Sequence, residues 1–194
     1  MIKLLKLDRF FVRLLVSAAV MFSPVLFAEE LSTYSEFPKN SKTEVIPFPI
    51  EFAPDITLNG IEELVFLQGM YKPDSEAFFS YAFSWTHKPE KAQVFKKSEI
   101  KKFIAAYYSG LYKAVSNGKE RESTVIIEQA GEKYRGQISW IEPFVTKEDQ
   151  TLYFEGSEVY CEKTNELRWY FLVSPQDSSH PVWTELQSIT PSSC

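Results

Sequence analysis

Residues 98–116 read SEIKKFIAAYYSGLYKAVS, and this stretch decides the fold class. Ser98 is a favourable N-cap, and Asn117–Gly118 is a typical C-terminal stop. Gly110 costs about 1 kcal/mol of helix propensity relative to alanine, but it lets a neighbouring segment approach closely. The apolar residues recur every three or four positions and form one stripe, made of Ile100, Phe103, Ile104, Tyr107, Tyr108, Leu111, Tyr112 and Val115. The pattern predicts one long helix that buries an aromatic side.

Segments with strand character flank this helix on both sides. Residues 76–86 alternate most strictly, with Phe79, Tyr81, Phe83 and Trp85 on one face and mainly small residues on the other. The other segments with strand character are 45–52, 63–71, 123–130, 133–141, 151–161 and 166–174, and the tail 181–194 suits a short helix or a strand. Short connections after the helix indicate antiparallel pairing. The predicted fold is α+β, a curved antiparallel sheet of about six to seven strands packed against one main amphipathic helix.

The first 28 residues have the pattern of a secretory signal peptide. Four basic residues come first and are followed by an uncharged apolar run of about 15 residues, shorter than the roughly 20 that a membrane-spanning helix needs. We expect cleavage after Ala28 and a periplasmic or secreted protein. An uncleaved N-terminal anchor is the alternative, because Leu26 is larger than the residue usually preferred at its position. Residues 29–44 are predicted to be a flexible polar lead-in, and 45–194 a single domain.

Charge and hydropathy restrict the partners. Residues 29–194 carry 17 basic and 25 acidic side chains, a net charge of −8. Such an acidic domain gains nothing from counterion release on DNA or RNA, so no nucleic-acid partner is expected. No apolar stretch after residue 28 is long enough for a transmembrane segment. The expected partner is an unknown protein or envelope component, and the oligomeric state stays open.

Cys161 and Cys194 are the only two cysteines. In an oxidising compartment an even pair most simply forms a disulfide, which would stabilise the fold by roughly 3–4 kcal/mol through chain entropy. Two free thiols, or a bond from Cys194 to another chain, are the alternatives.

The sequence carries no recognisable catalytic, cofactor or metal motif, so no catalytic, cofactor-binding or metal-binding residue is assigned and no cofactor is expected. His87 and His180 are too far apart in the chain to suggest a zinc site by themselves. Three carboxylate pairs would suit an acid–base hydrolase, namely Glu62–Glu63, Glu128 with Glu132, and Glu155 with Glu158. We interpret them as solvated strand and turn residues.

Two further features admit a functional interpretation. The aromatic strand and helix suggest sugar or lipid binding, and tyrosine and tryptophan would suit a partly hydrated pocket between helix and sheet, but we interpret the stripes as core. Six lysines fall within 15 residues and form a candidate patch for an anionic envelope surface or an acidic partner, with a solvated loop and polar helix face as the alternative interpretation. They are Lys88, Lys91, Lys96, Lys97, Lys101 and Lys102.

The stretch PFPIEFAPD at residues 47–55, followed by GIEE at residues 60–63 and the aromatic strand, resembles small uncharacterised secreted bacterial proteins. The resemblance implies a bacterial, envelope-exported protein and carries no activity with it. We therefore predict an exported, non-enzymatic binding or accessory protein of unknown ligand. A small envelope hydrolase with a carboxylate acid–base pair, and a carrier of an apolar ligand between helix and sheet, are the alternatives.

Overall fold

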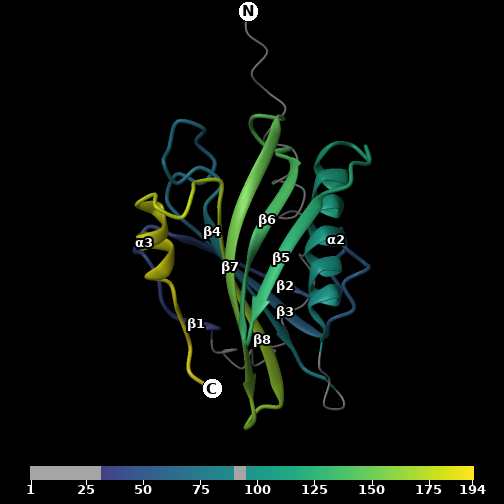
Figure 1. Ribbon diagram of the computed structural model, residues 1–194, viewed down its shortest axis with the longest axis vertical. Coiled ribbons are helices and arrows are strands. Elements are labelled where there is room, and N and C mark those ends of the chain that lie inside the picture. The colour runs from purple at the N-terminus through teal and green to yellow at the C-terminus, as the bar shows by residue number, and fades with distance from the viewer. Residues whose placement is uncertain (1–31, 90–94) are drawn as a thin grey trace, which may run out of the picture. The chain divides into compact units, whose positions relative to one another are not determined.

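The computed structural model describes residues 32–89 and 95–194. Within these residues, seven antiparallel strands form the main sheet in the order β2-β3-β4-β8-β7-β6-β5 (Figure 1). They are β2 Lys42–Pro47, β3 Gly60–Phe66, β4 Tyr81–His87, β5 Thr124–Ala130, β6 Lys133–Ile141, β7 Asp149–Cys161 and β8 Glu166–Ser174. A small second sheet pairs β1 Tyr34–Glu36 with β9 Thr190–Pro191. The predicted α+β fold, with a curved antiparallel sheet and one main helix, is confirmed.

The main helix is α2, Lys97–Val115. Its buried residues are five members of the predicted stripe, Ile100, Phe103, Ile104, Tyr107 and Tyr108. Ser98 is not the N-cap as predicted: Lys96 holds that position, and its backbone N–H donates to the Glu99 carboxylate at 2.9 Å. The acidic side chain three residues into the helix satisfies the free backbone donor instead of a serine hydroxyl.

The face of the sheet toward α2 carries an aromatic core, as the strand alternation predicts. Phe83 and Phe171 stack at a ring-centroid distance of 4.8 Å on neighbouring strands, and Trp85 beside them is fully buried. Gly110 of α2 faces the 50–53 loop, where an added Cβ would overlap the Phe52 carbonyl oxygen. The expected close approach at Gly110 is therefore present.

The opposite face is also buried, which the small residues of β4 did not indicate. The short helix α3, Val182–Gln187, covers it, so that α2 and α3 lie on opposite sides of the sheet (Figure 1). Trp183 and Leu186 of α3 pack with Val65 and Ala82 of the sheet in a second, smaller core. The tail therefore forms both a helix and a strand.

Residues 32–36 lie on the same face, although the sequence predicts a flexible lead-in there. The buried Glu63 carboxylate accepts hydrogen bonds from the Thr33 N–H at 2.7 Å and the Thr33 hydroxyl at 2.6 Å. Ser192 N–H donates to the Thr33 carbonyl at 2.8 Å, next to the β1–β9 pair. Long-range polar contacts, and not local periodicity, order this segment. Residues 32–194 form one compact unit, which begins before the expected domain start at Val45.

Strand β4 begins later than the aromatic alternation suggests. Residues 76–79 form turns, and Phe79 adopts a positive φ of 50°. The Phe79 N–H donates to the Met70 carbonyl at 2.9 Å, so the chain turns back before it enters the sheet at Tyr81. The Phe79 ring nevertheless joins the aromatic core, 5.2 Å from the ring of Trp140.

Candidate binding site

A partly open pocket of about 400 Å³ lies where the second half of α2, the 116–123 connection and the ends of β5, β6 and β7 meet. This volume falls in the range of about 300–1,000 Å³ that is typical of small-molecule sites. Three aromatic residues line it, Tyr108, Tyr112 and Trp140. The other lining residues are mostly polar: Arg121, Glu122, Ser123, Thr124, Ser139, Ile141, Asp149, Gln150 and Thr151.

Contacts with buried neighbours fix two residues of the aromatic wall, Tyr108 and Trp140. The rings of Tyr108 and Trp140 meet edge-on with their centroids 4.9 Å apart. The Tyr108 hydroxyl shares a hydrogen bond of 2.5 Å with the Tyr81 hydroxyl, and burial raises the pKa of Tyr108, so the phenol stays neutral. Tyr112 is half-buried, so its ring offers the pocket more accessible surface than the other two.

Three hydrogen bonds fix the polar wall. The Ser123 N–H donates to the Ser109 hydroxyl at 2.9 Å, and the Ser123 hydroxyl donates to the Ala105 carbonyl at 2.8 Å, which fastens the start of β5 to α2. The Trp140 indole N–H donates to the Gln150 side-chain oxygen at 3.1 Å. This contact orients the Gln150 amide group.

Charged groups of both signs lie around the pocket. Arg121, Glu122 and Asp149 are exposed, and among the described residues none of them forms an ion pair within 4.0 Å. Their planar groups therefore keep hydrogen-bonding capacity, donors on the guanidinium and acceptors on the carboxylates. A ligand that offers both donors and acceptors would match this arrangement.

A second unusual group, Glu62, lies beneath α2 with no exposed surface. The Trp85 indole donates to its Oε1 at 3.1 Å, whereas Oε2 has no hydrogen-bond partner of ordinary geometry. Burial raises the pKa of Glu62 to about 8, although Trp85 and the Tyr107 hydroxyl act in the opposite direction. Glu62 is therefore a neutral acid at neutral pH, but it is out of reach of a substrate in this conformation.

The carboxylate pairs suggested by the sequence do not converge on the pocket. Glu62 and Glu63 are neighbours on β3 and bond to opposite layers, Glu62 to Trp85 and Glu63 to Thr33. Glu128 pairs with Arg135 at 3.0 Å on the exposed surface.

The third pair is divided in the same way. The Glu158 carboxylate accepts from the Tyr134 hydroxyl and the Trp169 indole, both at 2.7 Å, whereas Glu155 is exposed and accepts from Gln187 of α3. Alternation along a strand separates carboxylates that are close in sequence.

The two histidines have structural contacts. The buried His87 accepts the Asn59 N–H on Nδ1 at 3.0 Å and packs its ring against Phe95. His180 accepts the Val182 N–H on Nδ1 at 3.2 Å, next to the start of α3. Within residues 32–89 and 95–194, no three side chains of the His, Cys, Asp and Glu types are grouped so that they could hold a metal ion.

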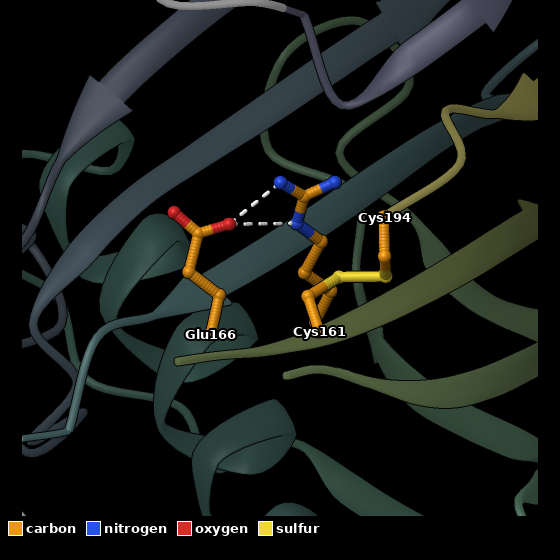
Figure 2. The surroundings of a disulfide bond; sticks show 4 residues. Cys161, Glu166 and Cys194 are labelled. Carbon is orange, nitrogen blue, oxygen red and sulfur yellow. Dashed lines mark hydrogen bonds and ion pairs between the residues drawn. A yellow bond between two sulfur atoms is a disulfide. The ribbon is translucent and has the colours of Figure 1, made fainter. Parts of the chain in front are cut away.

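The predicted disulfide is present and joins Cys161, at the end of β7, to Cys194 (Figure 2). Glu166 of β8, which pairs with Cys161, lies beside it (Figure 2). One Glu166 oxygen accepts from Nε and Nη2 of the Arg168 guanidinium, at 3.1 and 2.6 Å. Burial opposes ionisation of Glu166, but the hydrogen bond and charge of Arg168 outweigh it, so the pKa of Glu166 lies below its ordinary value. The covalent bond ties Cys194 to the end of β7, whereas the ion pair lies within β8.

The structure divides the six lysines of the candidate patch. Lys91 lies outside the described residues. Lys88 forms an ion pair with Glu166 at 3.4 Å. The remaining four are exposed at the start of α2: Lys96, Lys97, Lys101 and Lys102.

The pocket contains residues that sequence reasoning did not single out. Arg121 and Glu122 come from a helix-to-strand connection, whereas Asp149 and Gln150 begin β7. These polar residues are common in exposed turns and have no characteristic spacing, so no sequence signal brings them together. The amphipathic helix tyrosines were the available signal, because they suggested a partly hydrated pocket between helix and sheet.

None of the helices in the described part of the chain is long and apolar enough to cross a bilayer. The predicted signal peptide and its cleavage point after Ala28 lie outside the described residues. Comparisons with protein-family models, curated proteins and solved structures find no match to this chain.

Proposed function

We propose that the protein is an exported, non-enzymatic binding protein whose pocket takes a small carbohydrate. The observation that carries this proposal is the meeting of aromatic rings with planar polar side chains in one partly open pocket of about 400 Å³. Export is supported by the basic and apolar start of the sequence and by the disulfide between Cys161 and Cys194.

A sugar matches the pocket in two ways. Its apolar C–H face can lie on an aromatic ring such as Tyr112, because the face of the ring is apolar and carries a partial negative charge. Its hydroxyl groups both donate and accept, which suits a wall containing the Arg121 guanidinium, the Gln150 amide and the Asp149 carboxylate. Neither a purely apolar nor a purely anionic ligand would use both walls.

The two alternative functions receive less support from the described residues. A carrier of an apolar ligand needs a closed apolar cavity, whereas this pocket is partly open and has charged residues in its wall. A hydrolase needs an acid that burial keeps protonated, within reach of the substrate and beside a second carboxylate, whereas the pocket carboxylates Glu122 and Asp149 are both exposed. Glu62 has the raised pKa of such an acid but no exposed surface.

The test is a binding measurement on purified, oxidised residues 29–194. We expect saturation-transfer NMR and calorimetry to detect at least one of glucose, galactose, N-acetylglucosamine and their β-1,4-linked disaccharides. Tyr112→Ala should weaken that binding about fivefold, because it removes a stacking surface of roughly 1 kcal/mol. Asp149→Asn should weaken it by a similar factor or more, because it removes a charge-assisted hydrogen bond.

Tyr160→Ala is the matched control, because this tyrosine is exposed near the end of β7 that carries the disulfide and is not part of the pocket wall. It should leave saccharide binding unchanged. If a folded protein binds none of these saccharides, the ligand class is wrong. If binding occurs but is unaffected by both pocket variants, the pocket is the wrong site.

A further inference from the structure

The start of α2 differs in charge from the rest of the protein. Residues 88–102 carry six lysines and two glutamates, whereas the other residues after Ala28 carry 11 basic and 23 acidic side chains. A positive region on an otherwise acidic protein creates a directional field that orients the molecule toward negatively charged surfaces.

Four of these lysines form what we call the lysine patch: Lys96, Lys97, Lys101 and Lys102. All four are exposed, and none of them takes part in an ion pair among the described residues. Glu99 lies in the same turn, but its carboxylate accepts the Lys96 backbone N–H at 2.9 Å. Unpaired lysines close to the positive N-terminal end of a helix are mildly unfavourable to the isolated protein. An anionic partner would reverse this effect.

The chemistry of the lysine patch favours a diffuse anionic surface over one defined phosphate or carboxylate site. Lysine is a flexible, strongly hydrated point charge, whereas arginine gives the planar bidentate contacts that define specific anion sites. The patch contains no arginine. Exposed lysines near an anionic lipid headgroup layer each contribute to binding without a fixed geometry.

We propose that the lysine patch docks the protein on an anionic phospholipid surface. The net charge of −8 does not prevent this, because acidic groups farther from the surface than the Debye length of about 8 Å at physiological salt are largely screened. The proposal uses no pocket residue and is independent of the saccharide.

Docking by this end would leave the pocket away from the lipid. Lys97 and Tyr112 are 15 positions apart on the same helix, a separation of about 22 Å at 1.5 Å per residue. The pocket residues of α2 belong to its second half, and the lysine patch belongs to its first turns. The two sites can therefore be occupied together.

The test is co-sedimentation of residues 29–194 with vesicles of phosphatidylcholine alone and of phosphatidylcholine mixed with phosphatidylglycerol. Binding is expected only with the mixed vesicles, and raising the salt to about 0.5 M should abolish it. Replacing all four patch lysines with glutamine should reduce binding by on the order of several hundredfold, since each lysine near the surface contributes about fivefold.

The matched control replaces four exposed lysines outside the patch, Lys72, Lys119, Lys133 and Lys147, with glutamine. It changes the net charge equally and should retain vesicle binding, and circular dichroism should show that both variants are folded. Equal loss in both variants, equal binding to neutral vesicles, or binding to soluble polyglutamate but not to mixed vesicles would each overturn the proposal. Saccharide binding, measured in parallel, should be the same in the patch variant and the wild type.

Discussion

Glu62 shows how one side chain can make stability depend on pH. Its pKa is raised from 4.5 to about 8 because burial penalises the ionised form. Between pH 4.5 and 8, Glu62 therefore keeps its proton in the folded protein, whereas in the unfolded chain it has lost it. Stability from this group is complete below the unfolded pKa and falls as the pH rises through the folded one, by on the order of a few kcal/mol in total.

We predict that Glu62→Gln removes this dependence. Glutamine keeps the shape and can still accept the Trp85 indole N–H, but it carries no proton to lose. The free energy of unfolding, measured in urea from pH 5 to pH 9, should fall less steeply with pH in the variant than in the wild type. The variant should be the more stable protein at pH 9.

Glu51→Gln, at an exposed position, is the control and should reproduce the wild-type profile. Parallel profiles for wild type and Glu62→Gln would show that Glu62 is ionised in the folded protein.

At the same scale, sequence reasoning found the chemical types but not their surroundings. Glu62 and Glu63 are equivalent in a sequence, yet one lies under a helix without exposure and the other is bonded to Thr33. The pocket residues Arg121, in the connection after α2, and Asp149, at the start of β7, meet only through tertiary packing. A single sequence contains no pattern that predicts such tertiary contacts.

Among the elements, the β1–β9 pair depends on the disulfide that joins the C-terminal end of the chain to the main sheet. Its strands contain three and two residues, and β9 is followed closely by Cys194, which is bonded to Cys161 of the main sheet. Strands this short contribute little stability by themselves. The disulfide therefore has a large share in keeping them in place.

We predict that Cys194→Ser loosens both strands and leaves the main sheet intact. Global stability should fall by about 2–5 kcal/mol, as for the loss of a native disulfide in a small domain. Amide hydrogen exchange should accelerate at residues 33–36 and 190–192, but not in β4 or β8 within the sheet.

Cys161→Ser/Cys194→Ser should resemble the single variant and should not respond to reductant, whereas the wild type should. Unchanged exchange at residues 33–36 after loss of the disulfide would show that the Glu63 contacts alone hold this segment.

Elements with a long periodic pattern were predictable, and short ones were not. The stripe of α2 and the hairpins of β5 to β8 were recognised because each pattern repeats over many residues. β1 and β9 have no such repeat, and their partners are more than 150 positions away along the chain. The turn at Phe79 was missed because its ring continues the aromatic alternation while its backbone leaves the strand.

For the whole molecule, export and oxidation are expected to occur together. Expression of the complete sequence in a bacterial host should yield a periplasmic product with the mass of residues 29–194 less two hydrogen atoms. Intact mass spectrometry with and without reductant measures both events. Ala28→Phe, which removes the small residue at the cleavage point, should block processing. A product that keeps Met1 in the wild type would contradict the cleavage prediction.

The opposed environments of Glu62 and Glu63 have a consequence for insertions and deletions. Losing one residue from the connection that precedes β3 would slide β3 by one position and exchange the two carboxylates between layers. Ile61 and Glu63 would then point to the side of the sheet that carries the Trp85 indole. Glu62 would point to the side that carries the Thr33 hydroxyl. The two neighbouring acids therefore help to specify the register of β3. A slipped pairing would also move Leu64 out of the aromatic layer.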